Sequence, residues 1–182
     1  MTLRQLKVGD QIDHRDFLDR VDMLSALGKP VLISNFLRYH RLVNYLSRYT
    51  PKPIGLPLGM HRLRDVLDEK YYTDQPGGLM ESLGQLFRKG VKLYAYPSLE
   101  PGGKLVTAET FEVAPNLHHL YEHLRENRLV ESLRDFNRAC LSVHPAEVLR
   151  QIQSGDPAWE HQVPEQVAEV IKAKGLFGFK RA

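Results

Sequence analysis

Apolar residues recur along this chain with two different spacings, and the alternation between them predicts an α/β fold. Helical spacing marks the segments 17–27, 42–49, 60–71 and 79–87. Short apolar runs at 30–34, 54–59 and 91–96 predict strands, and a further short strand is expected at 104–107. Strands that alternate with helices over residues 30–97 predict parallel pairing and right-handed crossovers. The expected core has three layers and a small, mainly parallel sheet of at least three strands, with helices on both faces.

Turn and capping residues refine these elements and suggest a domain boundary. Asp13 is placed to cap the first helix, and Pro57 predicts that its strand lies at a sheet edge or carries a bulge. Helical spacing continues at 115–127, 145–154 and 164–174, so the C-terminal region is expected to be helical. The turn residues 155–157 predict a core domain over 1–155, which includes the N-terminal helix, and a helical tail over 156–182. We expect Trp159 and Phe177 to anchor that tail against the core.

Composition and charge narrow the class of protein. The chain has 182 residues, of which 42% are hydrophobic and 26% charged, as in ordinary globular proteins. A net charge of +3 is too small to indicate a nucleic-acid or membrane partner. The single cysteine excludes an internal disulfide framework. The N-terminal segment lacks the apolar stretch of a signal peptide, and no run is long enough to span a bilayer, so we expect a soluble, cytoplasmic protein.

Polar and basic residues follow the first two predicted strands. Ligands of open α/β sheets bind at the carboxyl ends of strands, and helix N-termini there favour anions. These residues therefore predict a site for a phosphate-bearing ligand; the alternative is that they are solvated faces of helices. The candidate binding residues are Ser34, Asn35, Arg38, Arg41, His61 and Arg62, together with His40.

Other reactive side chains give weaker signals. His119 and His123 are four residues apart on a predicted helix, a spacing that can place two metal ligands on one face. No carboxylate is evidently paired with them, so we expect ordinary half-exposed histidines and assign no metal ligands. Cys140 lies among apolar neighbours and is expected to be a small buried thiol.

Five segments of the chain are distinctive as a set, namely 68–72, 77–84, 92–97, 155–160 and 175–178. Together they resemble a poorly characterised bacterial family, and the resemblance extends over nearly the whole chain. Members of that family often carry the label nicotinate- or nicotinamide-nucleotide adenylyltransferase, and some similar sequences are labelled as TonB-dependent receptors. The resemblance implies nucleotide binding and nucleotidyl transfer in nicotinamide nucleotide metabolism, with Mg²⁺ accompanying the nucleotide; the residues themselves specify no cofactor.

The adenylyltransferase label can be compared with the residues directly. Phe36 and His40 match the Phe-x-x-x-His spacing that such enzymes place after a strand, which makes His40 the candidate catalytic residue. Leu42 and Val43 stand where the enzymes have a glycine and a second histidine. The catalytic signature is therefore incomplete, and whether the chain is a nucleotidyltransferase-like enzyme stays open.

The alternative class is a non-catalytic interaction or regulatory module. It would dock a partner protein or a second copy of itself, and its candidate surface is aromatic. The aromatic residues concerned are Tyr71, Tyr72, Phe87, Tyr94 and Tyr96.

Overall fold

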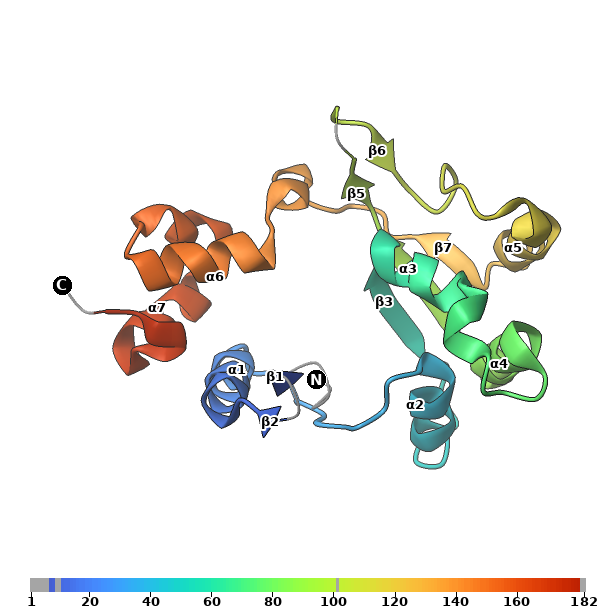
Figure 1. Ribbon diagram of the computed structural model, residues 1–182, viewed down its shortest axis with the longest axis horizontal. Coiled ribbons are helices and arrows are strands. Elements are labelled where there is room, and N and C mark those ends of the chain that lie inside the picture. The colour runs from blue at the N-terminus through green and yellow to red at the C-terminus, as the bar shows by residue number, and fades with distance from the viewer. Residues whose placement is uncertain (1–6, 9–10, 101, 181–182) are drawn as a thin grey trace. The chain divides into compact units, whose positions relative to one another are not determined.

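The computed structural model describes residues 7–8, 11–100 and 102–180. Contacts within the chain divide it into two compact units, which differ from the predicted 1–155 and 156–182 domains. Residues 38–141 form one unit, called here the strand unit, and residues 1–37 and 142–182 form the other, called the helical unit. The strand unit is thus inserted, along the chain, between the two parts of the helical unit. Figure 1 shows the elements of both units.

A three-stranded parallel sheet organises the strand unit (Figure 1). The order is β3 (Gly55–Gly59), β4 (Lys92–Tyr96) and β7 (Val130–Ser132). The register aligns Leu56 with Leu93 and Leu93 with Val130. Because β3 lies at an edge, the missing amide hydrogen of Pro57 breaks no ladder on its outer side, and the predicted edge position is confirmed.

The two faces of this sheet differ in burial. Leu93 and Ala95 point to the same face of the central strand, since side chains alternate along a strand, and both are completely buried. Tyr94 and Tyr96 point to the other face and are only half-buried. The strand unit therefore has its main apolar core on one side of the sheet.

Helices and short turns connect the strands. α3 packs against β3 and β4, α5 against β7, and α2 against α4. The helices are α2 (Tyr39–Leu46), α3 (Met60–Leu67), α4 (Gly78–Leu86) and α5 (His118–Glu126). The 3₁₀ turns are η2 (Glu69–Tyr72), η3 (Arg88–Gly90), η4 (Pro115–Leu117) and η5 (Arg138–Ser142), and a small antiparallel pair joins β5 (Ser98–Leu99) to β6 (Leu105–Val106).

The helical unit has a separate apolar core centred on Trp159, which is 1% exposed. The Phe179 ring meets the indole edge-on at a centroid distance of 5.9 Å. The elements are β1 (Lys7–Val8), β2 (Gln11–Ile12), α1 (His14–Ala26), α6 (Pro145–Ser154), η6 (Pro157–Gln162), α7 (Glu165–Lys174) and η7 (Leu176–Gly178).

Polar contacts hold α1 in this unit. Asp13 caps the helix as predicted, its carboxylate accepting the amides of Arg15 and Asp16 at 3.0 Å. Asp19 accepts the backbone amide of Phe177 at 2.6 Å. No residue of α1 is buried, although Met23 and Leu27, the residue that follows it, pack against the Trp159 core. α1 is therefore attached by charged and polar contacts more than by apolar burial.

The α/β class, the small mainly parallel sheet and the helical C-terminal region are confirmed. The predicted buried strand at 30–34 is wrong: only Ser34 makes a strand bridge, and Leu32 and Ile33 are 44% and 43% exposed. Residues 30–97 consequently contribute two strands to the parallel sheet, and β7 supplies the third.

Two expectations about single residues have different outcomes. Trp159 is buried, but its apolar neighbours belong to α6, α7 and the end of the chain instead of the sheet. Phe177 is half-buried in the same cluster. Cys140, expected to be buried, is exposed in η5.

None of the helices in the described part of the chain combines the length and the apolar character that a bilayer span requires.

Candidate functional site

The start of α3 follows the carboxyl end of β3 without a break. Gly59 ends the strand and occupies the N-cap position, where it offers no side chain to the free amides of the first turn. The His61 ring lies close to this glycine: a Cβ atom placed on Gly59 would be 3.3 Å from His61 Nδ1. No acidic residue stands in the first turn. This helix start therefore keeps its partial positive charge at the edge of the sheet.

The start of α2 has the same character. Arg38 occupies the N-cap position in an extended conformation, and its side chain makes no capping hydrogen bond. The first turn again contains no acidic residue, and Arg41 is exposed within it. Arg41 is therefore accessible from solvent.

Two tyrosines lie beside these helices. Burial raises the pKa of Tyr39 at the start of α2, while the Arg62 charge lowers it and Asp65 raises it. Burial also raises the pKa of Tyr72 to about 12. The Tyr72 hydroxyl donates to the Val66 carbonyl at 2.8 Å, and the Arg38 guanidinium lies 5.8 Å from its ring centroid.

Carboxylates neutralise two of the four candidate cations. Arg38 pairs with Asp74 at 2.5 Å, and Arg62 pairs with Asp65 at 3.1 Å. Arg38 Nη1 is buried and has no hydrogen-bond partner in the described part of the chain. Within that same part, Arg41 and His61 form no ion pair, so they are the side chains best placed to meet an external anion. We call Arg38, Arg41, His61 and Arg62, which stand at the N-terminal ends of α2 and α3, the cationic cluster.

His40 lies apart from the exposed members of this cluster. It is 3% exposed on the face of α2 that packs against α4. Burial lowers its pKa, and the positive charges of Arg41 and Arg38 lower it further, so the imidazole is neutral at pH 7. The structure thus brings His40 into the core of the strand unit and not to the surface beside Arg41.

Ser34 and Asn35 belong to the helical unit, whereas the cationic cluster belongs to the strand unit. Their contribution to a ligand site stays a prediction. The physical reason is the correction already described: residues 30–34 do not form a strand of the parallel sheet, so the sheet geometry that was expected to bring Ser34 beside His61 does not apply.

The strand unit also has a concave surface that no sequence motif predicted. Two hollows of about 380 Å³ each share Glu69 and Leu117 in their linings. A third, of about 230 Å³, shares Arg64, Phe111 and Glu112 with the first. We call these adjoining hollows the Arg64 groove. The Arg64 guanidinium lies 5.3 Å from the Phe111 ring centroid.

The Arg64 groove is built from segments that are distant in sequence. Its walls come from α3, η2 and residues 73–80 on one side and from the segment 110–117, which ends in η4, on the other. Helical spacing begins only at Pro115, so residues 110–114 gave no signal in the sequence.

Comparison with protein-family models, with curated proteins and with solved structures gives no significant match to this chain.

Proposed function

We propose that the strand unit binds a phosphate-bearing small molecule at the cationic cluster. The observation that carries this proposal is that α2 and α3 both start without a side-chain cap and without an acidic residue in the first turn. Phosphate oxygens would accept hydrogen bonds from the free amides, and the exposed Arg41 and His61 would add two side-chain donors. A nucleotide is the ligand that the resemblance implies.

Nucleotidyl transfer is the finer form of this proposal. It would require His40 to reach the ligand from its position between α2 and α4, and Mg²⁺ to accompany the nucleotide. Burial favours the neutral form of His40, which can donate one hydrogen bond to a phosphate but adds no positive charge. Binding is therefore the part of the proposal that the geometry supports best.

A thermal-shift and calorimetric titration with ATP, nicotinamide mononucleotide and pyrophosphate tests this proposal. Ligand that binds only the folded state should raise the melting temperature by mass action. Arg41→Ala should weaken binding roughly ten- to a hundredfold, because a hydrogen bond to a charged group contributes about 1.5–3 kcal/mol. Arg48→Ala removes an exposed arginine just beyond the other end of the same helix and is the matched control.

Saturable binding that Arg41→Ala weakens and Arg48→Ala leaves intact supports the proposal. Equal effects of the two variants would indicate only a general loss of positive charge. The absence of binding by all three compounds would contradict the nucleotide assignment.

A protein-interaction module is the second candidate, and the Arg64 groove favours it. One of its hollows is lined by Met80, which is 64% exposed, and Tyr71, next to the lining residue Tyr72, is 43% exposed. Of the other candidate aromatics, Tyr72 is buried in the core and Phe87 packs against it.

Self-association is the form of this candidate that can be tested with the chain alone. Sedimentation at increasing protein concentration should reveal a dimer that Met80→Glu disrupts, with the exposed Arg88→Glu at the end of the same helix as the control. A monomer at all concentrations would exclude a homo-oligomer built on this groove.

A further inference from the structure

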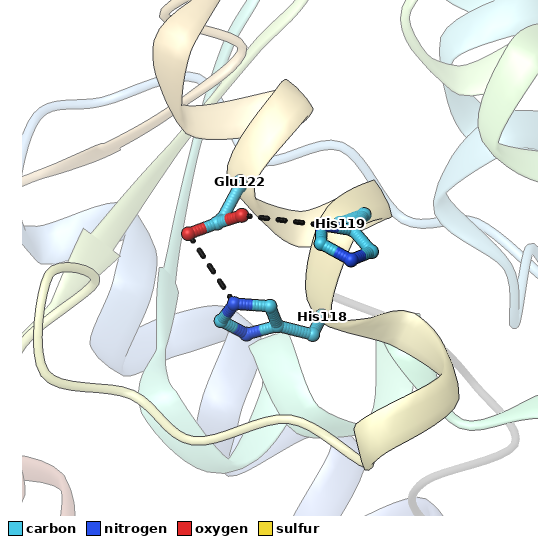
Figure 2. A group of neighbouring side chains, drawn as sticks. All are labelled: His118, His119 and Glu122. Carbon is cyan, nitrogen blue, oxygen red and sulfur yellow. Dashed lines mark ion pairs between the residues drawn. The ribbon is translucent and has the colours of Figure 1, made fainter.

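Two adjacent histidines open α5, and one carboxylate reaches both of them (Figure 2). Glu122 Oε1 lies 3.3 Å from His118 Nε2, and Glu122 Oε2 lies 3.5 Å from His119 Nδ1. The arrangement follows from helix geometry, because residues three and four apart share one side of a helix. Both rings therefore face the Glu122 carboxylate, one at each of its oxygens.

We propose that His118, His119 and Glu122 form a binding site for a divalent transition-metal ion such as Zn²⁺. One potential ligand atom from each residue lies within 4.8 Å of the other two. Two ligands of a tetrahedral zinc ion are about 3.4 Å apart when the bonds are about 2.0–2.2 Å long. The two histidine–glutamate distances are close to this value, although each ends on a different carboxylate oxygen. The three side chains are exposed and can rotate to bring one ligand atom each around a single ion.

The donor types select the class of metal. Two imidazole nitrogens and a carboxylate favour zinc, copper, nickel and cobalt over magnesium and calcium, which prefer oxygen ligands. Three protein ligands leave the fourth tetrahedral position free for water. The side chains of His118 and His119 are 60% and 95% exposed, so an ion can enter directly from solvent.

The position in the helix limits the strength of this site. The N-terminus of α5 carries partial positive charge, which opposes a cation, and the Glu122 carboxylate offsets it. Exposed ligands must also become ordered when the ion binds. We therefore expect micromolar binding and not the tight binding of a buried structural zinc site.

The helical spacing in the sequence had pointed to His119 and His123 as a possible pair of metal ligands. His123 Nδ1 lies 3.2 Å from the Asn127 amide nitrogen, so this ring already has a partner further along the helix. The side chain that His119 contacts is Glu122 and not His123. Within the described residues, His118, His119 and Glu122 are the group of three ligand-type side chains that converges in this way.

Titration of the full chain with Zn²⁺ alone, followed by calorimetry in a buffer that does not chelate metals, tests the site. We expect one ion per chain. Glu122→Gln keeps the side-chain shape and should weaken binding at least tenfold, as should His119→Ala. His123→Ala is the matched control on the same helix and should change the affinity less than twofold. Far-ultraviolet circular dichroism verifies that α5 persists in each variant.

Substitution of Co²⁺ for Zn²⁺ provides a readout of geometry. Tetrahedral coordination should give visible absorption that Glu122→Gln abolishes and His123→Ala retains. The proposal is overturned if the wild-type chain shows no saturable binding, or if all three variants bind as the wild type does. Because this cluster shares no residue with the cationic cluster, the result is independent of the phosphate-binding test.

Discussion

The strand unit and the helical unit are stabilised in different ways. The strand unit surrounds Leu93, Val91 and Leu63, all of which are fully buried, in elements that follow one another along the chain. The helical unit joins segments from both ends of the described chain, and charged side chains of α1 make several of the connections. Apolar burial therefore stabilises the strand unit. The helical unit is stabilised by apolar burial together with a few polar contacts between residues that are distant in sequence.

Core truncation in each unit is expected to have the largest effect. Leu93→Ala in the strand unit should cost about 2–5 kcal/mol, and Trp159→Ala in the helical unit about 3–5 kcal/mol. Trp159 is the only tryptophan, so its fluorescence reports the helical unit alone, while circular dichroism reports both. In urea, Leu93→Ala should lower the midpoint seen by circular dichroism and leave the fluorescence midpoint in place.

A fluorescence midpoint that moves together with the circular dichroism midpoint would show that the two cores unfold as one. The two units would then not be independent in unfolding. Leu18→Ala, at a 60% exposed position, should leave both midpoints nearly unchanged and serves as the control.

Loss of one polar contact of α1 should have an intermediate effect. Asp19→Ala removes the acceptor for the Phe177 amide, and a hydrogen bond to a charged group contributes about 1.5–3 kcal/mol. The contact also holds Phe177 at φ 58°, a left-handed conformation that is unusual for an aromatic residue. Urea unfolding monitored by Trp159 fluorescence measures the loss.

Asp22→Ala on the same helix is the matched comparison. Asp22 pairs with Lys174 at 2.7 Å, but the two side chains are 45% and 53% exposed, so solvent screens the pair. Its loss should cost less than about 1 kcal/mol. Equal effects of the two substitutions would contradict the special role assigned to the Phe177 contact.

Acidification should have the smallest effect, and it should act on the strand unit through His40. Because burial lowers the pKa of His40 in the folded state, the unfolded chain takes up a proton first as the pH falls through about 6.5. The stability contributed by neutral His40 is therefore complete above that pH and declines below it. Urea midpoints from pH 7.5 to 5 should fall, with a shallower slope in His40→Gln.

The slope is the relevant readout, because it does not depend on the absolute stability of the variant. A His40→Gln slope identical to wild type would contradict the predicted role of this imidazole.

Strands were predictable where the apolar run had a partner nearby in sequence. The runs around Leu56 and Leu93 are β3 and β4, which pair directly. The run at 30–34 is also apolar, but it belongs to the other unit, and a single residue there forms a bridge. Conversely, β7 has only three residues, one of them Glu131, and too few side chains to give a strand spacing.

The candidate site was predictable in part for the same reason. The helices that carry Arg41 and His61 were predictable from helical spacing, but the strand expected before Arg41 is absent from the sheet, and the burial of His40 depends on how α2 packs. The Arg64 groove and the pairing of Glu122 with His118 depend on tertiary and side-chain geometry. Neither has a spacing in the sequence that distinguishes it from an ordinary helix surface.

The long separation between Asp19 and Phe177 has a consequence for biosynthesis. The two residues are 158 positions apart, so α1 leaves the ribosome well before its partner exists. At roughly 5–20 residues per second, the delay is about 10–30 s. Synthesis of the strand unit ends earlier, so this unit can fold before α1 can contact Phe177. During that interval α1 lacks this contact and is accessible to chaperones and proteases.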